Sequence, residues 1–205
     1  MTPRKPTFCN HAGPKKASWK FNCPVAIKQE DDACLATAIT HAVMCDSPLK
    51  GDSLERMAIV KALRLDHRLN THKGGHRQDI LKAVDVAIDL GYARHSVPIE
   101  TFEQYKHYIV DFPVVIGFDQ FEGMAIPSSG GFIGPSGRRL PTKHAMVLLG
   151  RNKGWRWWPL SGRYSVIKNS GGSDWGYQHG EAFITDGDLK KLFEIGNVQA
   201  VAVVK

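Results

Sequence analysis

The fold is decided by the stretch Cys34-Leu-Ala-Thr-Ala-Ile-Thr-His-Ala-Val43, a run of small and apolar residues in the first part of the chain. A run of this kind predicts a buried helix. Its first residue is a cysteine, and the N-terminus of a helix favours an anionic thiolate over a neutral thiol. We expect Asp32 to cap this helix and Cys34 to lie in its first turn. The stretch therefore places a candidate nucleophile at the end of a core helix.

Three further residues complete what a thiol acyl-transfer enzyme needs. Gln29 lies just before Cys34, whereas His144 and Asn169 lie far downstream. A thiolate attacks an acyl carbon, an imidazole accepts and returns the proton, and an amide oxygen holds the imidazole in its useful tautomer. A donor before the nucleophile stabilises the oxyanion. Taken singly, Cys34 is also consistent with a small core residue, His144 with a strand histidine and Asn169 with a turn residue.

An acidic loop, Glu30-Asp-Asp32, precedes the nucleophile. Nearby carboxylates disfavour a thiolate, but solvent screens exposed carboxylates, so we expect the helix and a histidine imidazolium to dominate. If Gln29 reaches the oxyanion, this loop must pass along the substrate cleft. Asp31 or a neighbour would then face the substrate and favour a cationic side chain beside the scissile bond. The alternative is that Asp32 caps the helix and the other two carboxylates point to solvent.

Length and composition bound the class of protein. The chain has 205 residues, of which 42% are hydrophobic, and it can bury a substantial core as one large domain or two lobes. The charged N-terminus is not followed by an apolar stretch, and no later run approaches the length of a membrane span, so we expect neither a Sec signal peptide nor a transmembrane segment. The four cysteines are not required as a disulfide scaffold, and we expect the cytoplasm or another reducing compartment.

The net charge of +7 raises the question of a nucleic-acid partner. Basic residues crowd the segment 4–20, and the others are scattered. Because no zinc-finger, RNA-recognition or helix-turn-helix motif accompanies them, we interpret the charge as a solvated basic surface with an N-terminal extension over 1–17. Neither nucleic acid nor a membrane is expected as a partner. Two groups of histidines and cysteines have loosely metal-like spacing but fit no zinc motif, so no metal or other cofactor is expected.

Helical and strand patterns are segregated along the chain. Apolar positions with three-and-four spacing predict amphipathic helices over 54–65 and 80–90. Short apolar runs bounded by glycine, proline or polar turns predict strands over 114–118, 144–149, 155–158, 164–168, 181–185 and 198–204. This order predicts an α+β protein with a mainly helical lobe over 18–111 and a mainly β lobe, an antiparallel sheet or partial barrel, over 112–205. A cysteine on a helix of one lobe would face a histidine on a strand of the other across a cleft.

Four segments carry a resemblance to a known family. The longest is Tyr164-Ser-Val-Ile-Lys-Asn-Ser-Gly-Gly-Ser-Asp-Trp-Gly-Tyr-Gln-His-Gly-Glu-Ala-Phe183, a strand followed by Lys-Asn-Ser, a Trp-Gly pair and a closing strand. The others are Lys143-His-Ala-Met-Val-Leu-Leu-Gly150, Lys73-Gly-Gly-His76 and Asp111-Phe-Pro-Val-Val-Ile116. Their order and content resemble the papain-like cysteine peptidases, and the resemblance covers about residues 18 to 205.

This resemblance implies a papain-like fold and a role for each matched residue. It implies Cys34 as the nucleophile, His144 as the general acid and base, and Asn169 as the residue that orients the histidine. Gln29 and the Cys34 backbone N–H would form the oxyanion hole, although Gln29 is closer to the nucleophile than is usual in the family. Residues expected to bind substrate are Gly74, Gly75, Asp31 and Trp175.

The chain also departs from the family pattern. Gly171 stands where a tryptophan usually shields the bond between the asparagine and the histidine, so we expect that bond to be exposed to water and weak. Leu35 replaces the usual aromatic residue after the nucleophile. Asp31 and Lys73 occupy two positions that secreted members join by a disulfide, which is consistent with reducing surroundings. Because Cys34 lies near the start of the chain, we expect the long inhibitory prosegment typical of the family to be absent.

The function predicted from these observations is a papain-like thiol hydrolase that cleaves peptide or isopeptide bonds of a protein or peptide substrate. One alternative is a catalytically silent papain-like domain that binds a protein partner in its cleft. Another is a thiol acyltransferase that keeps the triad but delivers the acyl group to an amine instead of water. Labelling of the active-site thiol separates the first alternative from a hydrolase, and product analysis with added amine separates the second.

Overall fold

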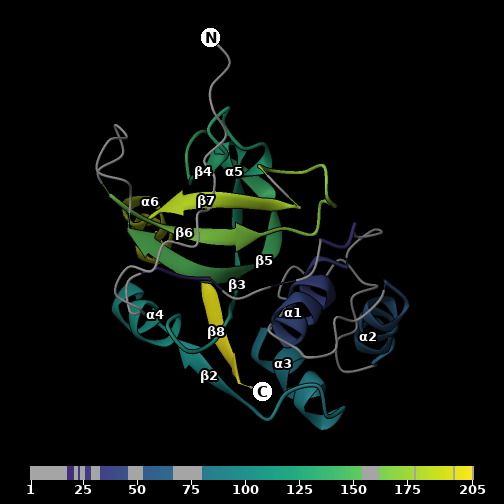
Figure 1. Ribbon diagram of the computed structural model, residues 1–205. Coiled ribbons are helices and arrows are strands. Elements are labelled where there is room, and N and C mark those ends of the chain that lie inside the picture. The colour runs from purple at the N-terminus through teal and green to yellow at the C-terminus, as the bar shows by residue number, and fades with distance from the viewer. Residues whose placement is uncertain are drawn as a thin grey trace.

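Three helices gather on one side of the molecule, beside a twisted sheet (Figure 1). The computed structural model describes residues 18–20, 23, 26–28, 33–45, 53–66, 80–153, 162–177, 179–195 and 197–204. The three helices are α1 (Cys34–Met44), α2 (Ser53–Leu65) and α3 (Ile80–Asp89). Their positions confirm the helices predicted from the apolar spacing. Within the described ranges, no helix is long and apolar enough to cross a membrane.

Helix α1 is the central helix, and all of its residues are buried. Small side chains on every face allow neighbouring elements to approach it from all sides. The helix begins at Cys34, so the N-cap position falls on Ala33, whose methyl group accepts no hydrogen bond from the first turn. The N-cap residue is therefore Ala33 and not Asp32 as expected, and Asp32 lies outside the described residues.

The strands form a mixed sheet in the order β2-β8-β3-β5-β6-β7-β4, and β1 pairs with β5 outside this path. Their bounds are β1 (Ser18–Lys20), β2 (His95–Ile99), β3 (Val114–Phe121), β4 (Phe132–Ile133), β5 (Arg139–Lys153), β6 (Arg163–Lys168), β7 (Glu181–Thr185) and β8 (Gln199–Val204). The pairing of β4 with β7 is parallel, whereas an antiparallel sheet was expected. Five of the six predicted strands are present, and the segment predicted at 155–158 lies outside the described residues.

Some elements were not predicted from the sequence. Strand β2 falls within the range expected to be mainly helical, yet it pairs with β8 at the edge of the sheet. Its sequence contains Pro98 and little apolar alternation, and proline is tolerated on an edge strand. Short helices α4 (Phe102–Tyr108), α5 (Glu122–Ala125) and α6 (Asp186–Glu194) were missed as well. Helix α4 is nonetheless signalled locally by a capping box in which Thr101 and Gln104 exchange hydrogen bonds.

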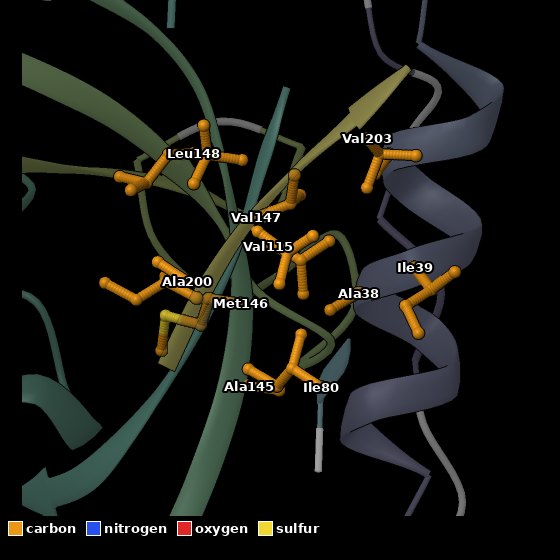
Figure 2. Packing of buried hydrophobic residues seen from close by; sticks show 14 of the residues in the cluster. Ala38, Ile39, Ile80, Val115, Ala145, Met146, Val147, Leu148, Ala200 and Val203 are labelled. Carbon is orange, nitrogen blue, oxygen red and sulfur yellow. The ribbon is translucent and has the colours of Figure 1, made fainter. Parts of the chain in front are cut away.

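The hydrophobic core lies between α1 and the sheet. Figure 2 shows Ala38 and Ile39 on the helix, with Val115 of β3 and Ala145 of β5 on the neighbouring strands. Helix α1 packs against both strands. Burial of each large apolar side chain in this core stabilises the fold by roughly 1.5–3 kcal/mol. The packing also brings the helix that begins at Cys34 against the strand that carries His144.

Candidate active site

The clearest polar contact of the site joins His144 and Asn169. His144 lies on β5, and Asn169 directly follows β6, the strand that pairs with β5. The distance between His144 Nε2 and Asn169 Oδ1 is 2.6 Å. An amide oxygen only accepts hydrogen bonds, so Nε2 carries the hydrogen in this contact and Nδ1 remains available for proton transfer. The Ser170 backbone N–H also donates to Asn169 Oδ1, at 2.7 Å, and fixes the orientation of the amide.

The surroundings of His144 shift its protonation equilibrium in two directions. Burial lowers the pKa of His144 below its usual value because a low-dielectric environment disfavours the imidazolium. The hydrogen bond with Asn169 raises the pKa and offsets part of this effect, since the amide oxygen stabilises the protonated ring. Phe118, the partner of His144 across the β3–β5 ladder, lies edge-on to the imidazole with ring centroids 6.3 Å apart. The ring is therefore held from two sides.

Cys34 is the first residue of α1 and its exposed fraction is 5%. A thiolate at this position lies at the positive end of the helix dipole. Among the described residues, Cys23, Cys34 and Cys45 form no disulfide. The helix that positions Cys34 packs on the strand that positions His144.

Trp175 lies against the turn that follows Asn169. A Cβ atom at Gly171 would lie 2.8 Å from Trp175 Cβ and 2.9 Å from its Cγ, so only glycine leaves room for this side chain. The indole N–H of Trp175 donates to the Ala125 carbonyl at 3.0 Å, which holds the ring in place. Asn169 has an exposed fraction of 7%. The bond between Asn169 and His144 was expected to be exposed to water, but Asn169, which accepts it, is buried.

The segment Ala26–Lys28 runs beside the same turn. The Ala26 backbone N–H donates to the His179 carbonyl at 3.1 Å, and Lys28 forms an isolated β-bridge with Gly171. The Ile27 backbone N–H donates to Nε2 of His41, at 3.1 Å. Sequence reasoning did not identify His41 as a site residue, although it is a histidine in a helical run of mostly small and apolar residues.

A buried ion pair lies directly before Asn169. Lys168 ends β6, Glu181 begins β7, and the two residues are partners across the ladder. Their Nζ and Oε1 atoms are 3.2 Å apart, and the Lys168 side chain is fully buried. This pair was not predicted from the sequence, because it depends on the register between the two strands.

Four of the predicted site residues lie outside the described residues, namely Gln29, Asp31, Gly74 and Gly75. Their proposed roles in the oxyanion hole and in substrate binding stay predictions. Within the described part of the chain, no group of three or more His, Cys, Asp or Glu side chains is arranged to hold a metal ion.

Comparison with solved structures identifies the architecture. The chain is similar to digestive procathepsin L 3 of Tenebrio molitor larval midgut, with a TM-score of 0.62, 13% identity, and coverage of 97% of this chain and 73% of the other. It is similar to the bromelain protease of Ananas comosus, solved with the E64 inhibitor, with a TM-score of 0.63, 16% identity and coverage of 94% and 99%. It is also similar to xylellain, a cysteine protease from Xylella fastidiosa, with a TM-score of 0.60, 13% identity and coverage of 92% and 85%.

These similarities show that the fold is papain-like, as predicted from the sequence. No protein-family model matches the chain, and no curated protein matches it. The identities are low, so they show the fold alone.

Proposed function

We propose that this protein is a papain-like thiol hydrolase that cleaves peptide or isopeptide bonds. The observation that carries the proposal is the 2.6 Å contact between His144 Nε2 and Asn169 Oδ1. His144 lies on β5, and this strand packs against α1, the helix that begins at Cys34. The structural neighbours named as proteases support the same reaction class. The substrate is a protein or a peptide, and the reaction requires no cofactor.

The proposed mechanism begins with the transfer of a proton from Cys34 to His144. Cys34 gives its proton to Nδ1, and the resulting thiolate attacks the carbonyl carbon of the scissile bond. The tetrahedral oxyanion is stabilised by the Cys34 backbone N–H and, as a sequence-based prediction, by the Gln29 side chain. His144 then donates its proton to the leaving amine, and a thioester to Cys34 remains. Water, deprotonated by His144, hydrolyses the thioester and regenerates the thiol.

Asn169 has a positioning task in this scheme. Its amide oxygen holds the Nε2–H of His144 throughout, so Nδ1 stays free to exchange a proton with the sulfur. Because Asn169 Oδ1 also accepts from the Ser170 backbone, rotation of the amide would break two hydrogen bonds at once. The orientation of the imidazole is therefore set before substrate arrives.

A biotinylated peptidyl epoxide tests the proposal. The purified protein should be labelled once, and peptide mapping should place the label on Cys34. Labelling should be lost in Cys34→Ser and greatly slowed in His144→Ala, whereas Cys23→Ser, which removes a different half-buried thiol, should be labelled like the wild type. Absence of labelling in a folded wild-type protein would favour a silent binding domain. Formation of an amide product when amine is added, at the expense of the acid, would instead assign an acyltransferase.

The compartment follows from the same chemistry. A thiol nucleophile is lost when it is oxidised, and the described cysteines form no disulfide. We therefore propose that the protein works in a reducing environment.

A further inference from the structure

His41 is a buried histidine that the proposed reaction does not use. It lies on α1, about two turns after Cys34, and its exposed fraction is 0%. A fully buried imidazole on a helix made otherwise of small and apolar residues is costly unless its nitrogens find partners. One partner is known, because Nε2 accepts the Ile27 backbone N–H at 3.1 Å. A nitrogen that accepts a hydrogen bond carries no proton, so His41 is neutral in this structure.

The surroundings of His41 keep it neutral. Burial is the largest cause, and the positive charges of Lys168 on β6 and Arg56 on α2 add to it, so the pKa of His41 falls to about 3. The charge of Lys168 is itself held in the interior by Glu181. The acceptor nitrogen of His41 is thus preserved over the whole pH range in which a thiol hydrolase works.

The segment 26–28, which His41 contacts through Ile27, lies between the nucleophile helix α1 and the turn that follows Asn169. Ala26 and Lys28, on either side of Ile27, contact the Asn169 side of the molecule through the His179 carbonyl and Gly171. The fit is close, because a Cβ atom at Gly180 would lie 2.2 Å from the Ala26 Cβ and one at Gly172 would lie 3.1 Å from the Lys28 Cβ. The Asn169 backbone N–H in turn donates to the Gly180 carbonyl, at 3.0 Å. The segment 26–28 is therefore in contact with the nucleophile helix on one side and with the Asn169 turn on the other.

We propose that His41 is a positioning residue: its neutral imidazole fixes the segment 26–28 to the nucleophile helix and thereby sets the geometry of the chain entering the oxyanion site. This inference rests on the proposed thiol hydrolase activity. Gln29, the proposed oxyanion donor, follows Lys28 directly in the sequence. Loss of the His41 contact releases the segment from α1 while Cys34 and the His144–Asn169 pair remain where they are. The defect should then appear in stabilisation of the oxyanion and not in formation of the thiolate.

Two variants test the inference. His41→Leu removes the acceptor but keeps an apolar side chain of similar reach, and His41→Gln keeps an acceptor oxygen near the position of Nε2. A peptidyl aldehyde adds to the sulfur and creates an oxyanion, whereas iodoacetamide alkylates the sulfur without one. His41→Leu should lower kcat and the affinity for the aldehyde by about 10- to 100-fold, because a small displacement of an oxyanion donor is enough for such a loss. KM and the rate of alkylation should change little, and His41→Gln should recover most of kcat.

Hydrogen exchange at the Ile27 amide gives a readout that does not require activity. In His41→Leu, exchange at this amide should accelerate about 10-fold or more, while amides in the middle of α1 stay protected, and His41→Gln should restore protection. The inference would be overturned if the Ile27 amide of His41→Leu exchanged at the wild-type rate. It would also be overturned if the aldehyde affinity and the alkylation rate of His41→Leu fell by the same factor and its melting temperature fell as well. If the wild type neither cleaves peptides nor reacts at Cys34, the proposed function fails, whereas the exchange experiment still decides whether His41 holds the segment.

Discussion

Lys168 and Glu181 face each other across β6 and β7 as a buried ion pair, 3.2 Å apart, with Asn169 the next residue after the lysine. Taking two charges out of water is costly, and their mutual attraction only compensates when both are present. The pair therefore links β6 to β7 at the residue that precedes Asn169, which orients His144. Its integrity should affect both stability and activity.

The first prediction is a double-mutant cycle on this pair. Lys168→Met or Glu181→Leu alone should lower the free energy of unfolding by about 3–5 kcal/mol, because each leaves an uncompensated buried charge. The double variant Lys168→Met/Glu181→Leu should be close to the wild type. Urea denaturation followed by circular dichroism measures all four proteins. Additive losses in the double variant would show that the two side chains do not act as a pair.

The second prediction concerns the nucleophile and its base. Cys34→Ala and His144→Ala should each remove nearly all turnover of a peptide substrate and leave the melting temperature almost unchanged. The combined variant should be little worse than either, because residues that act as a unit in one step have non-additive effects. Initial rates with a fluorogenic peptide provide the measurement. Turnover that persists in pure Cys34→Ala would refute the assignment of this cysteine.

The sequence predicted the parts of the fold that have continuous apolar runs. Helix α1 and strands β3, β5 and β8 are of this kind, and their apolar patterns match their burial. Strand β2 was not predicted because its sequence contains a proline and because only its pairing with β8 makes it a strand. Its pairing also joins part of the range 18–111, which was expected to be mainly helical, to the sheet. Local periodicity carries no information about which strand pairs with which.

The candidate site could be predicted only where the residue type itself indicates a chemical role. A cysteine, a histidine and an asparagine in the order Cys34, His144 and Asn169 could be identified, and the structure joins the latter two by a hydrogen bond. His41 was missed because its partner is a backbone N–H at Ile27, and a backbone donor leaves no signature in the sequence. The burial of Asn169 was missed because it depends on tertiary packing, which leaves no signature at the residue itself.

The third prediction concerns Asn169 and the pH dependence of the reaction. The hydrogen bond from His144 to Asn169 favours the protonated imidazole, so Asn169→Ala should lower the pKa of His144 further. Activity that depends on the imidazolium should then be lost at a lower pH on the alkaline side. Profiles of kcat/KM against pH for the wild type and Asn169→Ala provide the comparison. An alkaline limb that stays in place would argue that Asn169 does not contact the histidine during the reaction.

The fourth prediction uses His41 as a probe of acid stability. Its pKa in the folded protein is about 3, against an ordinary value of 6.5. Between these two values the unfolded chain binds a proton that the folded chain does not, so stability falls as the pH falls, by about 1.4 kcal/mol for each pH unit. His41→Gln removes this proton, and its unfolding free energy should decline less steeply than that of the wild type between pH 6 and 4. Parallel declines in urea titrations would show that His41 takes up its proton while folded.

The fifth prediction concerns the close approach of Trp175 to Gly171. Gly171→Ala places a Cβ atom 2.8 Å from the Trp175 Cβ, a distance that side chains do not tolerate, so the indole must move and its hydrogen bond to the Ala125 carbonyl should break. We expect a loss of about 1–3 kcal/mol of stability, as for other substitutions that overfill a packed site, together with a shift of the Trp175 indole N–H resonance. Gly162→Ala is the matched control, because a Cβ atom there meets nothing within 4 Å. In a Trp175→Gly background the cost of Gly171→Ala should largely disappear, since both the Cβ and the ring that it would meet are gone. An undiminished cost in that background would mean that the glycine is required for its backbone and not for the room it leaves to Trp175.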